Sequence, residues 1–259
     1  MLGAIVGDIV GSIYEIKNHK SKEFPLFKDE SYFTDDSVLT CATALAILDG
    51  GSYADLYRKI GLSFAGAGYG GMFVRWLMDD SMGPYDSFGN GSAMRVSPVG
   101  WAFDTEEDVL AAAKASAEVS HNHPEGIKGA QATALAIFLA RNGRSQTEVV
   151  RKIESMFGYD ISTPIDEIRG SYSFDVTCQG TVPEALRCFL EADGFEDAIR
   201  NAISIGGDSD TLAAITGSIA EATFGIPEDI ANTAIARLDE RLVTILVRFY
   251  QQHMPQRRT

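Results

Sequence analysis

Apolar residues along most of this chain recur every three or four positions, which is the spacing of one helix face. The clearest short stripes are Ile5, Ile9 and Ile13, then Val38, Ala42, Leu45 and Ala46, then Leu56, Ile60 and Phe64. A last, longer pattern begins at Pro227 and continues through Ile230, Ala234, Leu238, Leu242, Ile245 and Phe249. These stripes predict helices that bury their apolar faces against one another.

Residues that favour helix ends mark several boundaries. The segments 105–108 (Thr-Glu-Glu-Asp) and 145–148 (Ser-Gln-Thr-Glu) each read as a capping box at the start of a helix. An Ala-rich helix is expected over Gly126–Leu139, ending near Gly143. Pro183 stands where the first residue of another helix is expected.

The same pattern predicts the fold class. Only Tyr172, Phe174, Val176 and Cys178 alternate as a strand would, and that stretch is short. No hairpin signal or alternation of strands and helices accompanies it. We therefore expect an all-α fold, a compact orthogonal bundle of roughly ten helices or more.

Composition sets limits on the class of protein. The chain has 259 residues, of which 45% are hydrophobic and 22% charged, so residues 1–259 are expected to form a single globular domain. The net charge is −14, which argues against stable binding of nucleic acid, because that binding depends on clustered Lys and Arg. A phosphate-bearing ligand would need a local reversal of charge from a metal ion or a helix N-terminus.

Three cysteines without a zinc-like spacing favour a reducing, cytoplasmic location. No apolar run has the ~20 residues that a membrane-spanning helix needs, and the partly apolar start Met1–Gly11 lacks a basic leader. No coiled-coil heptad demands assembly, so a monomer is expected. The polar, basic end Gln256–Thr259 is expected to fray.

Two short acidic clusters are the main chemical signal. One is Thr34, Asp35, Asp36 and Ser37, and the other is Asp208, Ser209, Asp210 and Thr211 after two glycines. Each stands at the start of a predicted helix, where Asp, Ser and Thr are common caps. Capping alone accounts for either cluster taken singly.

Taken together, the clusters supply more oxygen atoms than capping uses. If the two helix starts face each other, four carboxylates repel in a cleft of low dielectric constant unless a cation lies between them. Ligands that are all oxygen suit a hard cation such as Mg²⁺ or Mn²⁺, and bridging carboxylates would allow two such ions.

A glycine-flanked loop and a histidine are weaker candidates. The loop is Ser87, Phe88, Gly89, Asn90 and Gly91, which is typical of a turn but also lets backbone N–H groups approach a phosphate, with Phe88 stacking on a ring. His121 follows a predicted helix, where it would interact with the helix C-terminus or with a ligand.

These segments together resemble the ADP-ribosylglycohydrolase family. The similarity covers nearly the whole chain and rests on Gly7-Asp8 to Glu15, Phe33–Ser37, Gly89–Arg95, Ser120-His121, Val182–Leu186 and Gly206–Thr211. It implies an all-α fold around a cleft that holds two Mg²⁺ or Mn²⁺ ions. The implied metal ligands are Glu15, Thr34, Asp35, Asp36, Asp208, Asp210 and Thr211.

The resemblance also implies an activity. Water would hydrolyse the bond between C1″ of ADP-ribose and an acceptor, with Asp35 or Glu15 as the catalytic base and with Ser87, Phe88, Gly89, Asn90, Gly91 and His121 binding the substrate. Two other functions stay open at this point, a non-catalytic ADP-ribose-binding module and a metal-dependent phosphoesterase acting on the pyrophosphate. The acceptor and the choice between Mg²⁺ and Mn²⁺ also stay open.

Overall fold

The structure, a computed structural model, describes residues 1–253, so the end that was expected to fray lies outside the described residues. Most of the described chain is helical, and within it the only β-type pairing is one isolated bridge between Gly89 and Thr177. The helices are α1 (Leu2–Gly11), α2 (Asp35–Asp49), α3 (Tyr53–Ser63), α4 (Gly71–Met78), α5 (Gly91–Met94), α6 (Ser97–Ala102), α7 (Glu106–Glu118), α8 (Pro124–Arg141), α9 (Gln146–Phe157), α10 (Ile165–Ser171), α11 (Cys178–Leu190), α12 (Phe195–Ile205), α13 (Ser209–Phe224), α14 (Glu228–Ile235) and α15 (Glu240–His253). The predicted all-α class is confirmed.

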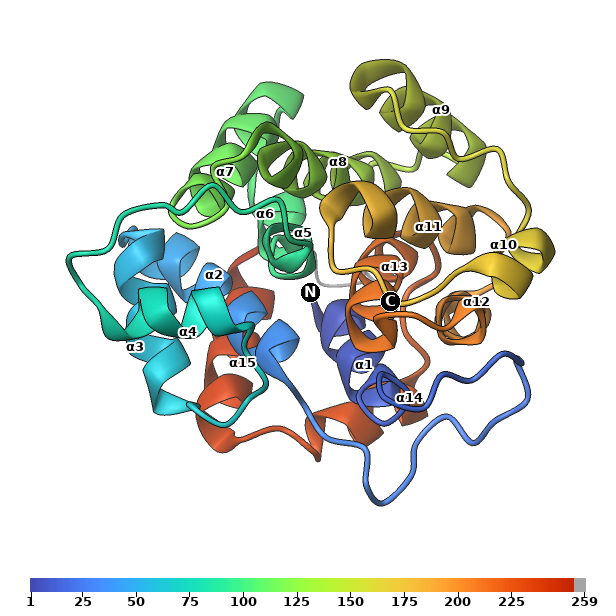
Figure 1. The fold of residues 1–259 in the computed structure, drawn as a ribbon, viewed down its shortest axis with the longest axis horizontal. Helices are drawn as coiled ribbons and strands as arrows, with labels where there is room; N and C mark the ends of the chain where they lie inside the picture. The colour runs from blue at the N-terminus through green and yellow to red at the C-terminus, as the bar shows by residue number, and fades with distance from the viewer. Residues whose placement is uncertain (254–259) are drawn as a thin grey trace.

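Helix α13 lies at the centre of the molecule. It is buried from Ser209 to Glu221, and α1, α8, α11 and α12 pack around it. Figure 1 shows α2, α3 and α4 on one side of this centre, and α10, α11 and α12 on the other. One buried apolar cluster includes residues from Met1 to Phe249, so helices from both ends of the chain share a core.

Small residues bring α1 and α13 into close contact. A Cβ atom on Gly7 would clash with the carbonyl group of Ala213, and one on Gly11 would clash with the backbone of Asp210. The glycines repeated along α1 therefore let its backbone lie directly against α13. This approach places the end of α1 beside the acidic start of α13.

The helix-start signals were mostly correct. Ser145 and Glu148 form the full capping box at the start of α9. Thr105 caps α7, but the Asp108 carboxylate accepts from the Thr105 hydroxyl at 2.7 Å, so only half of the predicted box forms. The side chain of Asp108, which is shorter than that of Glu, bonds to the Thr105 hydroxyl instead of accepting from the Thr105 N–H.

Pro183 does not begin a helix, and this prediction was wrong. It lies inside α11, which starts at Cys178 because the Thr177 hydroxyl accepts a hydrogen bond from the Gly180 N–H at 3.1 Å. A threonine cap therefore outweighs the preference of proline for the first helical position.

The last long apolar pattern is divided between two helices, α14 and α15. The chain turns between them, where the Leu238 N–H bonds to the Ile235 carbonyl at 3.1 Å. The Asp239 carboxylate then accepts from the Arg241 N–H at 2.9 Å. This local side-chain bond stabilises the start of α15 and leaves the spacing of the apolar residues unchanged.

The strand-like alternation over residues 172–178 corresponds to an extended segment that leads into α11. Its Val176 carbonyl accepts from the Asn90 N–H at 2.8 Å, and the Cys178 N–H donates to the Phe88 carbonyl at 2.9 Å. The segment thus pairs with the glycine loop over a single bridge.

None of the described helices is long and apolar enough to cross a bilayer.

Candidate active site

The start of α2 is held by a carboxylate from α1. Asp8 accepts from the Thr34 N–H at 2.9 Å, from the Thr34 hydroxyl at 2.6 Å and from the Ser37 N–H at 3.0 Å, and the Ser37 hydroxyl also donates to it. Thr34 in turn caps α2 by accepting from the Asp36 N–H. Asp8 is fully buried, so it fixes the direction in which the first acidic cluster faces.

The start of α13 follows two glycines with left-handed backbone angles, φ 72° at Gly206 and φ 81° at Gly207. The Asn18 side chain accepts from the Gly207 N–H at 2.9 Å and donates to its carbonyl at 3.1 Å, which secures this turn. Asp208 precedes the helix but makes no capping hydrogen bond with its side chain. Its carboxylate accepts from the Asn90 amide at 2.7 Å instead.

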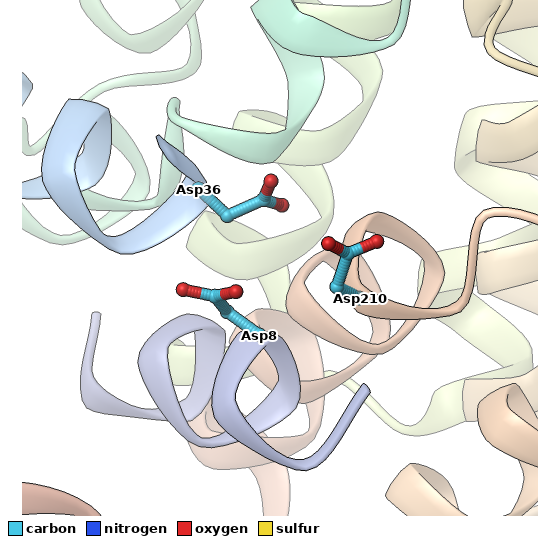
Figure 2. Close-up of side chains that lie close together, drawn as sticks. All are labelled: Asp8, Asp36 and Asp210. Atoms are coloured by element: carbon cyan, nitrogen blue, oxygen red, sulfur yellow. The ribbon is translucent and has the colours of Figure 1, made fainter. Parts of the chain in front are cut away.

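The two acidic clusters meet. Thr211 donates from Oγ1 to Asp36 Oδ2 at 3.4 Å. Carboxylate oxygens of Asp8, Asp36 and Asp210 lie within 4.8 Å of one another, and Figure 2 shows these side chains converging from three helices. Glu15, Asp208 and Asp210 form a second group at the same spacing. Asp210 belongs to both groups.

This proximity makes ionisation unfavourable. Burial raises the pKa of Asp8 to about 6. Burial and the charges of Asp8 and Asp208 raise the pKa of Asp35 to about 8. For Asp36 and Asp210, burial and the neighbouring carboxylates raise the pKa well above its ordinary range. The site therefore either holds protons or requires positive charge.

The donor atoms fit a hard divalent cation. Asp36 is buried, and its Oδ1 atom has no hydrogen-bond partner in the described chain, although a buried carboxylate oxygen requires one. The two groups of three carboxylates supply only oxygen, which is the ligand type of Mg²⁺ and Mn²⁺.

A cavity of about 500 Å³ opens above the acidic groups. The predicted site residues that line it are Glu15, Thr34, Asp35, Asp36, Ser87, Gly89, Asn90, Gly91, His121, Asp208, Asp210 and Thr211. Residues far apart in sequence therefore surround one space. Asn90 is partly committed within the protein, since its amide donates to Asp208 and to Thr181.

Phe88 is the exception among the predicted residues. Its side chain is 44% exposed, packs edge-on against His123 at 5.2 Å, and does not line the cavity. The aromatic side chains that do line it are Tyr32, Phe73, Tyr85 and Phe174. Phe174 belongs to the segment whose alternation resembled a strand, so the signal was present but was interpreted as secondary structure.

The sequence motifs contain two further residues to which they gave no role. Asp8 stands in the motif Gly7-Asp8 to Glu15 without an assigned role, although an ionisable residue within an apolar helix is itself a signal of function. Arg95 is fully buried and lines the cavity as its only Lys or Arg side chain.

Sequence similarity to known proteins extends over the whole described chain. A family model described as ADP-ribosylglycohydrolase matches residues 1–257. ADP-ribosylhydrolase ARH3 of Mus musculus is 24% identical over 309 residues, covering 88% of this chain and 83% of the relative. ADP-ribosyl-[dinitrogen reductase] glycohydrolase of Rhodospirillum rubrum is 26% identical over 159 residues, covering 60% and 52% of the two chains.

A solved structure supports the fold. The chain of an ADP-ribosylglycohydrolase-related protein complex superposes with a TM-score of 0.71 at 22% identity, covering 97% of this chain and 96% of that one. The arrangement of helices is therefore shared along almost the whole length.

Proposed function

Since this chain belongs to the ADP-ribosylglycohydrolase family, which is a family of hydrolases, we propose that it cleaves the N- or O-glycosidic bond between ADP-ribose and an acceptor with the help of two divalent cations. The observation that carries this proposal is the convergence of two carboxylate groups that share Asp210 beneath a cavity of about 500 Å³. The substrate is an ADP-ribosylated side chain or another ADP-ribosylated group, and the product is free ADP-ribose.

The cation ligands are the predicted residues Glu15, Thr34, Asp35, Asp36, Asp208, Asp210 and Thr211. Asp210 would contribute to both cation positions, one beside Asp36 and the other beside Glu15 and Asp208, because it belongs to both groups. Asp8 belongs to the first carboxylate group, but it would support the ligands rather than bind a cation itself, because four hydrogen bonds already occupy its oxygens. When bound, Mg²⁺ or Mn²⁺ would lower the pKa of a water molecule and orient the ribose hydroxyls.

Protein side chains perform the remaining steps. Asp35 would serve both as a ligand and as the base, because it lines the cavity and belongs to neither of the two close carboxylate groups, which leaves an oxygen to take the proton of the attacking water. Glu15 stays the alternative base, because its side chain is half-exposed at the same cavity. Water attacks C1″ while the bond to the acceptor breaks, and the sugar carries positive charge in the transition state. The acceptor leaves with the bonding electron pair and takes up a proton, which balances the proton that the water gives to the base.

Other residues of the cavity lining receive the rest of ADP-ribose. His121 and the loop residues Ser87, Gly89, Asn90 and Gly91 stand there as the substrate-binding set. Phe174 takes over the stacking role first expected of Phe88, because its ring lines the cavity and is 55% exposed. The proposed divalent cations would supply the local positive charge that lets an acidic protein bind an anionic ligand.

Product analysis tests this function against its alternatives. Purified protein is incubated with peptides carrying ADP-ribose on Arg or on Ser, with Mg²⁺, with Mn²⁺ and with a chelator. Free ADP-ribose that appears only with metal supports the proposal. An unchanged ligand would indicate a binding module, and AMP with ribose phosphate would indicate a phosphoesterase.

We also propose a cytoplasmic location and a monomeric state. Cys41, Cys178 and Cys188 are buried and free, which is compatible with a reducing, cytoplasmic location. Light scattering would test the monomeric state by measuring the molar mass of the protein in solution.

A further inference from the structure

A buried arginine forms part of the cavity wall. Arg95 is fully buried, and its guanidinium carbon lies 4.3 Å from the centre of the Tyr57 ring and 5.6 Å from that of Phe73. Its Nη2 donates to the Ser116 carbonyl at 3.0 Å and to the Ser120 hydroxyl oxygen at 2.9 Å, while Nε and Nη1 have no hydrogen-bond partner in the described chain. A buried cation that is stabilised mainly by aromatic rings is costly, which suggests a role beyond packing.

The hydrogen bond to Ser120 continues to His121. Ser120 Oγ lies 2.8 Å from His121 Nδ1. A guanidinium can only donate, so Ser120 Oγ accepts from Arg95. Among the described residues Nδ1 is the acceptor within reach of the Ser120 hydroxyl hydrogen, so that hydrogen points to Nδ1. Nδ1 is then an acceptor, and the ring hydrogen of neutral His121 is on Nε2.

Nε2 faces the cavity through a gap left by glycines. It lies 3.1 Å from the position that a Cβ on Gly91 would take and 3.5 Å from that of Gly89. His121 is 5% exposed, lines the cavity, and has no hydrogen bond from Nε2 to the described chain. Burial and the charge of Arg95 lower the pKa of His121 well below its ordinary value, which agrees with a neutral ring.

We propose that Arg95 and Ser120 are positioning residues that hold His121 in one neutral tautomer, with its Nε2–H directed into the cavity as a fixed hydrogen-bond donor. The opposite tautomer would present a lone pair, which repels the oxygens of a diphosphate or a sugar. The role as a ligand donor rests on the proposed function, whereas the tautomer is a property of the protein alone.

The tautomer can be measured directly. Long-range ¹H–¹⁵N spectra of histidine-labelled protein with Mg²⁺ distinguish a protonated from an unprotonated ring nitrogen, and a His121→Gln variant assigns the signals. We expect Nε2 protonated and Nδ1 unprotonated in the parent protein without ligand. A protonated Nδ1 in that sample would overturn the proposal.

Variants then test the relay, by which we mean the hydrogen bonds from Arg95 through Ser120 to His121. Ser120→Ala should give a mixture of tautomers and weaken ADP-ribose binding by about threefold to tenfold, the effect of losing one oriented hydrogen bond. Arg95→Met should raise the protonated fraction of His121 near neutral pH, and Arg95→Lys should restore the parent spectrum in part. Ser97→Ala is the control, since it removes another buried hydroxyl outside this relay and should change neither readout.

Each result has a definite meaning. If Ser120→Ala keeps both the parent spectrum and the parent dissociation constant, the relay does not exist. If the spectra behave as expected but the parent protein does not bind ADP-ribose, the proposed function fails while the positioning of His121 stands. Should Arg95→Met not fold, Ser120→Ala still decides the proposal.

Discussion

Thr211 donates a hydrogen bond to Asp36 over 3.4 Å, although 175 positions separate the two residues in the chain. The bond joins the start of α13 to the start of α2. Thr34 caps α2 in the ordinary way, but Asp208 makes no capping bond at the start of α13. There are therefore more carboxylates at this junction than capping of the two helices requires, and the remaining ones line the cavity.

Asp210→Asn should remove turnover, because this carboxylate belongs to both groups of candidate metal ligands. We expect the rate to fall by more than about a hundredfold, since even indirect partners of metal ligands affect activity by about 10- to 100-fold. The rise in unfolding temperature on adding Mg²⁺ should also disappear. Asp193→Asn, in the turn before α12, is the control and should retain both properties. Metal-dependent activity in Asp210→Asn would contradict the site.

The pH dependence of stability should be weaker with metal than without it. Folding raises the pKa of Asp8 to about 6 and that of Asp35 to about 8, so the folded protein binds more protons than the unfolded chain over this range. Stability of the metal-free protein must then fall as pH rises from about 4 towards about 8. Thermal unfolding with a chelator should show this fall, and Mg²⁺ should reduce it by favouring the ionised carboxylates. Equal slopes with and without Mg²⁺ would count against metal binding here.

Gly7→Ala should destabilise the fold, because its Cβ would clash with the Ala213 carbonyl in α13. We expect a loss of about 3 kcal/mol or more, at the upper end for overpacking. Gly170→Ala, in α10 with open space around it, is a matched control and should change stability by no more than about 1 kcal/mol, in the favourable direction. Denaturant unfolding measures both. A neutral Gly7→Ala would show that α1 can move away from α13.

Phe174→Ala should weaken ADP-ribose binding more than Phe88→Ala. Loss of one aromatic contact is worth about 1 kcal/mol, or roughly fivefold in the dissociation constant. Phe174 lines the cavity, whereas Phe88 packs on His123 outside it, so the second variant should change affinity by less than about twofold. Calorimetric titration gives both values. The reverse order would return the stacking role to Phe88.

Local patterns in the sequence were sufficient to predict the helical class and many helix starts. The 3.6-residue period and the capping residues act within one or two turns, so the Ser145–Glu148 box could be recognised without a partner segment. Predictions failed where two local preferences compete. Thr177 began α11 ahead of Pro183, and Asp239 divided the last apolar pattern into α14 and α15.

The sequence by itself determined which chemical groups are present: two acidic clusters at helix starts and an order of motifs typical of a hydrolase family. Only the tertiary structure decided that Asp36 and Asp210 converge, that Asp8 supports them from α1, and that Phe174 rather than Phe88 reaches the cavity. The physical reason is that helix propensity depends on neighbouring residues, whereas these contacts depend on how buried faces of distant helices pack. The close approach of α1 to α13 is the packing that brings the acids together.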